Sequence, residues 1–262
     1  MPENEPDCDL ALLTRAAKGA GDIAMQYWRN APKTWEKAEG AGPVTEADMA
    51  VNGYLETLLR GARPTYGWLS EESPDDPARG NCEHVFIIDP IDGTRAFIAG
   101  ERPFAVALAV VRRGKVAAGV VYLPALDKLY AATDVGPAML NDTPILHSNC
   151  TDPEAARVLT GKPSLTPLHW KGAAPGFDRH FRPSLAYRLC LVAEGKFDGV
   201  LSFWPCWEWD IAAGCLIAER AGAVATAPKG VALVYNQIPD PRSLGIWVAP
   251  PVLHATLVAR MA

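Results

Sequence analysis

The stretch Val85-Phe-Ile-Ile-Asp-Pro-Ile-Asp-Gly-Thr94 is the part of this chain that most constrains its fold. It opens with four apolar residues in a row, which is typical of a strand covered on both faces. Asp89 and Asp92 follow at the end of that strand, and the proline between them fixes the backbone. Gly93 and Thr94 then start a segment compatible with a helix. The stretch therefore predicts a buried strand that brings two carboxylates and several free backbone N–H groups to one small volume, where metal and phosphate could meet.

Two acids at this spacing also occur in ordinary turns, because Asp, Pro and Gly are the commonest turn residues. Three further acidic positions favour a metal site. Glu71 follows a strand-like run, Asp48 lies in a predicted helix, and Asp210 starts an apolar helix, where a carboxylate can face a cation. Each also has a plainer interpretation, as a solvated acid, a surface residue or a helix cap. Because all these donors are oxygen atoms and no histidine lies in the motifs, the pattern favours magnesium over zinc or iron.

Upstream of this stretch, the sequence predicts two helices packed against each other. Apolar residues recur every three or four positions over 9–29, which indicates an amphipathic helix. A loop rich in Gly and Pro, 30–43, leads to a second helix over 46–60, which Thr45 can cap.

Short β-prone runs follow the helices and predict a largely antiparallel sheet. They span residues 65–69, 84–89, 104–111, 116–123 and 129–133. A hairpin turn is predicted at 112–115. The first half of the chain is therefore expected to be α+β, with helices packed on a sheet.

Beyond residue 145, strands and helices alternate, which is typical of an α/β arrangement. The predicted strands are 156–160 and 199–203, the predicted helices are 184–195 and 210–222, and residues 163–182 are predicted to be an irregular surface loop. We therefore divide the chain into two domains. An α+β domain over 1–145 carries the metal- and phosphate-binding motifs, and an α/β domain over 146–262 contributes Asp210 and substrate contacts.

The composition excludes several classes of function. The chain has 262 residues, 49% of them hydrophobic, and a net charge of −5, so it lacks the basic surface that a nucleic-acid polymer requires. No run approaches the roughly 18 uncharged apolar residues of a membrane helix, and the beginning of the chain is acidic and amphipathic rather than signal-like. The 6 cysteines form no CxxC pair, which favours buried reduced thiols. We expect a cytoplasmic protein whose partners include neither nucleic-acid polymers nor membranes.

Four motifs together resemble the inositol monophosphatase superfamily of metal-dependent, lithium-sensitive phosphatases. Asp89-Pro-Ile-Asp-Gly-Thr94 is similar to its first signature, and Trp209-Asp-Ile-Ala-Ala-Gly214 is similar to its second. Glu71-Glu-Ser73 stands where the family carries an acidic metal-binding pair, and Pro43-Val-Thr-Glu-Ala-Asp48 resembles the segment upstream of that pair. The resemblance implies a five-layer α/β/α/β/α sandwich and, because many members form dimers, a homodimer.

The resemblance also implies which residues bind metal. Glu71, Asp89 and the backbone carbonyl of Ile91 would hold one Mg²⁺. Asp89, Asp92 and Asp210 would hold a second, so that Asp89 bridges the two ions.

A mechanism for phosphate-ester hydrolysis without a covalent intermediate follows from these roles. Asp48 resembles the acid that supports a further, weakly held Mg²⁺, which makes two to three ions in all. Thr94, hydrogen-bonded to Glu71 or Asp48, would orient the attacking water, and these three residues form the predicted catalytic group. The amides of Gly93 and Thr94 at the start of the helix would hold the phosphate.

The substrate class is indicated by smaller likenesses. Leu185-Ala-Tyr-Arg-Leu-Cys-Leu-Val-Ala-Glu-Gly195 and Glu208-Trp-Asp210 are similar to the bacterial branch that removes the 3′-phosphate from adenosine 3′,5′-bisphosphate. Phe203 stands where inositol-specific members carry an acid that binds the sugar hydroxyls. Ser70 stands where many members have Gly, which changes the freedom of the backbone before the metal-binding pair.

The small phosphorylated substrate is expected to contact Gly93, Thr94, Arg188, Trp207 and Glu208. An arginine suits a second phosphate, and a tryptophan suits a purine ring. The preferred prediction is a 3′(2′),5′-bisphosphate nucleotidase, and the alternative is an inositol-1-monophosphatase. Histidinol-phosphate or fructose-1,6-bisphosphate phosphatases, and a catalytically inactive anion-binding relative, are further alternatives.

Overall fold

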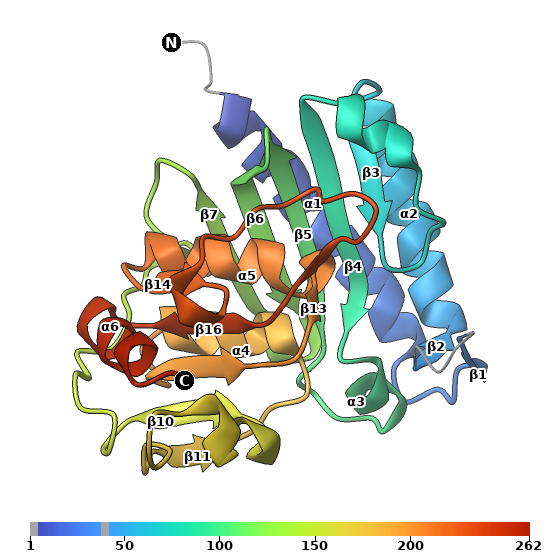
Figure 1. Ribbon diagram of the computed structural model, residues 1–262. Coiled ribbons are helices and arrows are strands. Elements are labelled where there is room, and N and C mark those ends of the chain that lie inside the picture. The colour runs from blue at the N-terminus through green and yellow to red at the C-terminus, as the bar shows by residue number, and fades with distance from the viewer. Residues whose placement is uncertain (1–4, 38–41) are drawn as a thin grey trace.

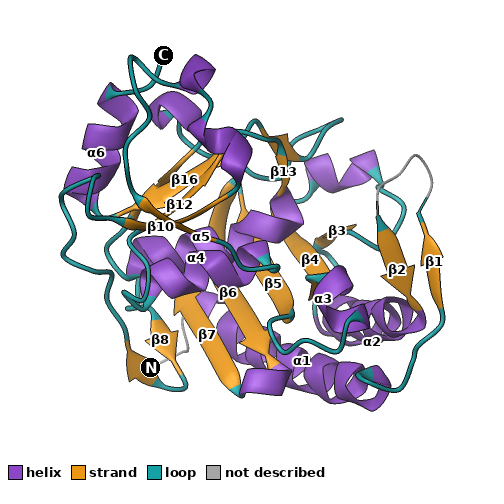
Figure 2. Ribbon diagram, turned by 90° about the horizontal axis from the view of Figure 1, so that it is seen from below, coloured by secondary structure: helices purple, strands orange, loops and turns teal. Residues whose placement is uncertain are grey.

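The protein is a sandwich of five layers, which a computed structural model describes over residues 5–37 and 42–262. Two helices cover the outer face of a seven-stranded sheet, two more lie between this sheet and a five-stranded one, and a last helix packs on the second sheet (Figures 1 and 2). The predicted α/β/α/β/α fold is therefore confirmed. The helices are α1 (Glu5–Tyr27), α2 (Glu46–Ala62), α3 (Thr94–Ile98), α4 (Leu185–Ala193), α5 (Glu208–Arg220) and α6 (Pro251–Ala259). Shorter 3-10 helices are η2 (Pro77–Asn81), η3 (Pro124–Leu126), η4 (Lys162–Leu165), η5 (Pro167–His169) and η6 (Pro228–Gly230).

The seven-stranded sheet is antiparallel except at one edge, where its first two strands run parallel. Its strands, in spatial order, are β3 (Gly67–Ser70), β4 (His84–Asp92), β5 (Ala105–Arg112), β6 (Lys115–Leu123), β7 (Lys128–Thr133), β8 (Met139–Leu140) and β9 (Thr143–Pro144). The five strands predicted in the first half all fall in this sheet, and β5 and β6 form the expected hairpin.

The outer face of this sheet is covered by α1 and α2, as the spacing of their apolar residues predicts. Fully buried alanines of α1, including Ala16 and Ala20, let the helix lie close to its neighbours. The predicted cap of α2 is confirmed, because the Thr45 hydroxyl accepts a hydrogen bond from the Ala47 amide at 3.1 Å.

The segment predicted as a loop, 30–43, contains an unexpected strand. Here β1 (Thr34–Glu36) pairs antiparallel with β2 (Pro43–Thr45), and the residues that join them, 38–41, lie outside the described part of the chain. Strands of three residues between Gly and Pro carry too little periodicity to be recognised in a sequence.

The second sheet contains strands from the later part of the chain, in the order β11 (Asp178–His180), β10 (Arg157–Thr160), β12 (Gly199–Ser202), β16 (Ile246–Ala249) and β14 (Val224–Thr226). A two-stranded ribbon of β13 (Cys206–Trp207) and β15 (Arg242–Ser243) lies apart from it. β11 falls within the predicted loop 163–182. The strands β14 and β16 and the helix α6 were not predicted.

The middle layer joins the two halves, because α4 and α5 share one apolar core with strands of both sheets. Gly214 is needed there, since a Cβ atom at this position would lie 2.7 Å from Leu189 Cδ1 of α4. The chain changes from the first sheet to the second near residue 145, where the domain boundary was predicted. Because the two halves share one apolar core, their division into separate domains stays a prediction. In the described residues, no helix has the length and apolar character to cross a membrane.

Candidate active site

Asp89 and Asp92 reach the same side of the sheet because β4 carries a bulge between them. In a regular strand, side chains three residues apart point to opposite faces. Here Asp89 lies opposite Ala107 and Asp92 opposite Ala105, so three steps along β4 match two steps along β5. The extra residue turns Asp92 onto the face that Asp89 occupies, toward α4 and α5.

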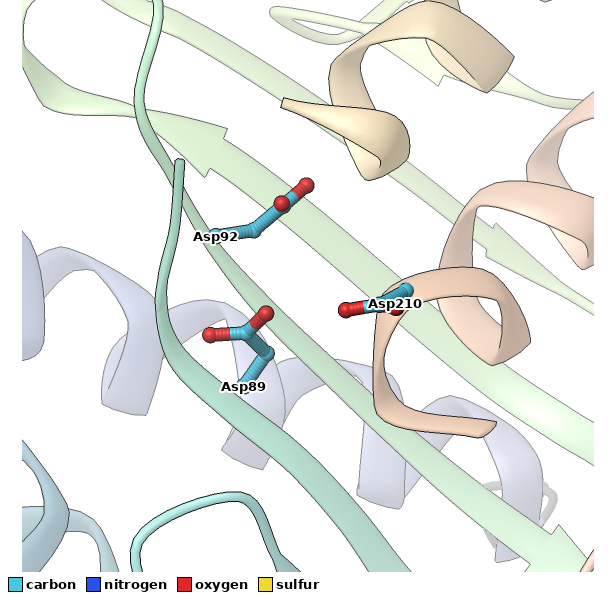
Figure 3. Close-up of side chains that lie close together, drawn as sticks. All are labelled: Asp89, Asp92 and Asp210. Atoms are coloured by element: carbon cyan, nitrogen blue, oxygen red, sulfur yellow. The ribbon is translucent and has the colours of Figure 1, made fainter. Parts of the chain in front are cut away.

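Asp210 completes a group of three carboxylates. It lies in the first turn of α5, and the backbone amide of Trp207 donates to its Oδ2 at 3.3 Å. One carboxylate oxygen from each of Asp89, Asp92 and Asp210 lies within 4.8 Å of the others, and the three side chains lie close together (Figure 3). Residues that are more than 100 positions apart in the sequence therefore meet, as the sequence predicts.

The three carboxylates are strongly perturbed by their surroundings. Burial, and then the negative charges of Glu71, Asp92 and Asp210, raise the pKa of Asp89 well above its usual range. Burial and the neighbouring acids also raise the pKa of Asp210. Such a group is unfavourable when ionised unless a cation neutralises it, and three hard oxygen donors around a shared volume fit Mg²⁺.

Asp92 is also held by the start of α4. The Ser184 hydroxyl and the Ala186 amide each donate to its Oδ2 at 2.6 Å, and the Leu185 amide donates to Oδ1 at 3.3 Å. Burial raises the pKa of Asp92, although these hydrogen bonds oppose the shift. One carboxylate thus links β4 of the first sheet to a helix of the middle layer.

Glu71 lies beside Asp89 because β3 and β4 are parallel and in register, with Ser70 opposite Ile88. Its carboxylate forms an ion pair with the ammonium of Lys37 at 2.7 Å, and the same ammonium contacts Glu72 at 2.6 Å. Burial opposes the charge of Lys37, but the two glutamates outweigh it and raise the Lys37 pKa. No sequence pattern pointed to this contact, because Lys37 stands in a segment without periodicity.

The predicted hydrogen bond from Thr94 to Glu71 or Asp48 is absent. The Thr94 hydroxyl donates instead to the Ile91 carbonyl at 3.1 Å. Asp48 is fully buried and caps α2, where its Oδ2 accepts the Thr45 amide at 2.8 Å and hydroxyl at 2.6 Å. Its second oxygen has no hydrogen-bond partner among the described residues, and burial raises its pKa to about 6. Asp48 therefore contacts the cap of its helix and not Thr94.

A cavity of about 440 Å³ opens onto the carboxylates, a size that suits a small metabolite. Gly93 has a φ of +96°, a conformation that favours glycine, and this turn starts α3 at the cavity wall. The wall contains Gly42, Pro43, Glu71, Asp89, Ile91, Asp92, Gly93, Thr94, Arg95, Ala96, Glu101, Phe181, Pro183 and Asp210.

Three of the predicted substrate contacts, Glu208, Trp207 and Arg188, lie outside this wall. Glu208 is buried, and its carboxylate accepts the backbone amides of Asn236 at 2.6 Å and Gln237 at 2.9 Å. The Trp207 ring stacks on Trp209, with a centroid separation of 4.6 Å. Both side chains contact other protein groups and neither lines the cavity, so a substrate contact for Glu208 or Trp207 stays a prediction.

Arg188 does not line the cavity but contacts two residues that do, Phe181 and Pro183. Its guanidinium carbon lies 4.7 Å from the centre of the Phe181 ring, and its Nη2 donates to the Pro183 carbonyl at 3.2 Å. Sequence reasoning missed Phe181, which falls in the segment predicted as an irregular loop. Phe203 is not at the cavity either, since its ring stacks on His169 with a centroid separation of 4.1 Å.

Comparison with known proteins agrees with the resemblance seen in the motifs. Residues 5–261 match the sequence pattern of the inositol monophosphatase family. The chain is 35% identical over 199 residues to the inositol-1-monophosphatase of Rhizobium meliloti, covering 71% of this chain and 73% of that protein. It is 32% identical over 240 residues to the 3′(2′),5′-bisphosphate nucleotidase CysQ of Salmonella typhimurium, covering 87% and 94%.

A solved structure supports the same assignment. The extragenic suppressor protein suhB from Bartonella henselae superposes with a TM-score of 0.82 at 28% identity, covering 96% of this chain and 97% of that one. Both the sequence and the fold thus match over nearly the whole length. The chain therefore belongs to the inositol monophosphatase family, whose members include phosphatases that hydrolyse phosphate monoesters.

Proposed function

We propose that this protein is a Mg²⁺-dependent phosphomonoesterase that acts on a 3′(2′),5′-bisphosphate nucleotide, converting adenosine 3′,5′-bisphosphate to AMP. The observation that carries the proposal is the meeting of Asp89, Asp92 and Asp210 beside a cavity of metabolite size. A phosphate monoester needs its negative charge neutralised before water can attack, and this group of acids is suited to hold the ions that do so.

The metal ligands are assigned from the geometry and the family motifs. Glu71, Asp89 and the Ile91 carbonyl would hold one Mg²⁺, and Asp89, Asp92 and Asp210 would hold a second. Bound Mg²⁺ would neutralise the phosphate and the leaving oxygen and lower the pKa of an attacking water. For the Glu71 carboxylate to bind metal, the Lys37 ammonium must move or share it, because the two groups are 2.7 Å apart.

The chain's own residues orient the reactants. Because the Thr94 hydroxyl donates its proton to the Ile91 carbonyl, its oxygen can accept a hydrogen bond from the attacking water. Water adds to phosphorus, the bond from phosphorus to the ester oxygen breaks, and Glu71 accepts the proton that the water releases. The departing oxygen takes a proton from solvent. Asp48, next to Glu71 in the field of the same charges, is assigned a supporting role.

The phosphate is assigned to the amides of Gly93 and Thr94. The first helical hydrogen bond of α3 runs from the Ala96 amide to the Gly93 carbonyl, so the preceding amides are not used inside the helix. Because α3 follows directly from the bulge that carries the two aspartates, Gly93 and Thr94 line the same cavity as the carboxylates.

The nucleotide is favoured over inositol phosphate by two observations. The likeness to the Salmonella nucleotidase extends over 94% of that protein, and the cavity wall contains an aromatic ring and an arginine. The inositol monophosphatase alternative is favoured by the 35% identity to the Rhizobium protein.

A panel of substrates tests the proposal. Inorganic phosphate release is measured from adenosine 3′,5′-bisphosphate, inositol 1-phosphate, histidinol phosphate and fructose 1,6-bisphosphate, with Mg²⁺ and with added Li⁺. We expect the nucleotide to give the largest kcat/KM, with complete dependence on Mg²⁺. A larger value for inositol 1-phosphate would establish the alternative, and no release from any substrate would support an inactive relative.

A further inference from the structure

Phe181 presents an aromatic ring to the cavity that holds the carboxylates. It lies between β11 and α4, lines the cavity wall, and has 54% of its surface exposed. Exposed large apolar side chains inside a polar cavity are unfavourable in water, and they are useful when a ligand covers them.

The ring is held in place from one side. The Arg188 guanidinium lies over it at 4.7 Å, and the side chains of Arg188 and Arg182 donate to the carbonyls of Pro183 and of Phe181 itself, at 3.2 and 2.7 Å. The guanidinium lies over the ring, more than half of the residue stays exposed, and the residue lines the cavity, so surface remains on which a flat group can stack. A fixed ring loses little conformational entropy when a second flat group stacks on it.

Arg95 is the cationic residue of the same wall. It lies in the first turn of α3 and is exposed, and its guanidinium makes no hydrogen bond or ion pair to any residue that the structure describes. Trp204 and Trp207 are also exposed aromatic residues, but neither lines the cavity, so they are not positioned to stack on a ligand bound there.

We propose that Phe181 is the stacking surface for the leaving group and that Arg95 binds a second phosphate on it. The inference rests on the proposed phosphatase function and narrows its substrate to an ester with a planar aromatic ring and a second anion. Arg188 is a positioning residue, which fixes Phe181 from behind. A purine nucleoside bisphosphate presents both features, whereas an inositol phosphate presents neither a flat ring nor a second charge.

The test compares variants on substrates that differ in one feature. All three substrates carry a phosphate ester that can be cleaved. Adenosine 3′,5′-bisphosphate also has the base and a second phosphate, adenosine 3′-monophosphate has the base but no second phosphate, and glycerol 2-phosphate has neither. For Phe181→Leu, we expect kcat/KM for both nucleotides to fall about 10- to 100-fold relative to glycerol 2-phosphate, the size of a lost stacking contact. Phe181→Trp should restore the ratio, because it keeps an aromatic face.

Trp204→Leu is the matched control, since it removes an exposed aromatic ring outside the cavity and should leave all three ratios unchanged. Equal losses of Phe181→Leu on all substrates would overturn the inference, because they would show a purely structural role. The inference would also be overturned if the ratio of kcat/KM for the nucleotides to kcat/KM for glycerol 2-phosphate stayed at the wild-type value in Phe181→Leu.

Arg95→Gln tests the second half of the inference. We expect it to lower kcat/KM for the bisphosphate by about 10-fold relative to adenosine 3′-monophosphate, because only the former carries the second anion. Equal effects on both nucleotides would contradict a phosphate contact.

The inference can fail separately from the proposed function. If the wild-type protein prefers inositol 1-phosphate, the proposed substrate is wrong, but the nucleotide ratios still test the role of Phe181. If nothing is turned over, calorimetric titration of AMP into the protein with Mg²⁺ measures stacking directly. AMP binding that Phe181→Leu weakens by about 10-fold or more supports stacking, and AMP binding that is absent or unchanged refutes it.

Discussion

Asp92 and Asp210 differ in the hydrogen bonds that their carboxylates accept from the protein. Asp92 accepts hydrogen bonds from three donors at the start of α4, whereas among the described residues Asp210 accepts only the Trp207 amide, at 3.3 Å. Both are proposed to hold metal, but Asp92 also links β4 to α4 and so joins the two halves of the chain. Variants of the two residues should therefore distinguish an effect on metal binding from an effect on the stability of the fold.

We expect Asp210→Asn and Asp92→Asn each to lower phosphate release by at least about 100-fold, as when a group that stabilises developing charge is removed. Their thermal unfolding in EDTA should differ. Asp210→Asn should unfold at or above the wild-type temperature, because it removes a buried negative charge. Asp92→Asn should unfold at a lower temperature, since weakened hydrogen bonds to buried donors cost about 1 to 3 kcal/mol. Near-normal activity in either variant would refute the metal assignment.

At the scale of elements, hydrogen bonds connect α2 to the end of β3, which Glu71 and Glu72 follow directly in the chain. The Ser70 hydroxyl donates to Asn52 Oδ1 at 2.7 Å and accepts the Glu72 amide at 3.3 Å. The Asn52 amide donates to the Ser73 hydroxyl at 3.0 Å. These hydrogen bonds form a polar clamp on the backbone just before Glu71 and Glu72.

Asn52→Leu should weaken the apparent affinity for Mg²⁺ without removing any of the proposed metal ligands. It keeps the approximate volume of the side chain but leaves the Ser70 and Ser73 hydroxyls without their partner on α2. We expect the Mg²⁺ concentration for half-maximal activity to rise about 10-fold, the size of effect seen when a group that orients a ligand is lost, with a smaller change in kcat.

Thr57→Val provides the control on the same helix, because the Thr57 hydroxyl donates only to the Gly53 carbonyl at 2.9 Å. This variant should leave the Mg²⁺ requirement unchanged. An Asn52→Leu protein with the wild-type Mg²⁺ requirement would show that the clamp does not position the glutamates.

At the scale of the molecule, the buried acids make stability depend on pH and on metal. Burial raises the pKa of Asp48 to about 6 and that of Glu72 to about 7, and it raises the pKa values of the three clustered aspartates. The folded protein therefore binds protons more tightly than the unfolded chain. This contribution to stability is full below the ordinary pKa values near 4 and is lost as pH rises through the raised ones.

Without metal, we expect the unfolding temperature to fall between about pH 4 and pH 7 as these carboxylates ionise. Mg²⁺ should reverse the loss, so its stabilising effect should grow from pH 5 to pH 8. At 100 times the dissociation constant, binding contributes about 2.7 kcal/mol, or about 5 to 10 °C in a chain of this size. Thermal unfolding with EDTA and with Mg²⁺ at each pH measures the difference.

Two variants check that the effect arises at the site. Asp210→Asn should reduce the Mg²⁺-dependent shift, whereas Asp22→Asn, at an exposed position on α1, should not change it. A shift that is the same at pH 5 and pH 8 in the wild-type protein would contradict the linkage to the buried acids.

Much of the fold follows from local patterns. The apolar run before Asp89 predicts β4, the period of α1 and the cap at Thr45 predict the outer helices, and α5 begins close to the predicted position. The short strands β1 and β2 were missed, because segments of three residues have no measurable periodicity. Glu208 and Trp207 do not line the cavity, because being close to Asp210 in the chain does not determine which way a side chain points.

Local patterns were enough to predict the strand and helices that carry the candidate acids, and the resemblance to the family indicated the roles of those acids. Neither could reveal that a bulge turns Asp92 toward Asp89, that Lys37 pairs with Glu71, or that Phe181 lines the cavity, and these features come from the folded chain. Each of them depends on how segments that are distant in the chain pack together or pair in register. Such long-range packing leaves no periodic signal in a single sequence.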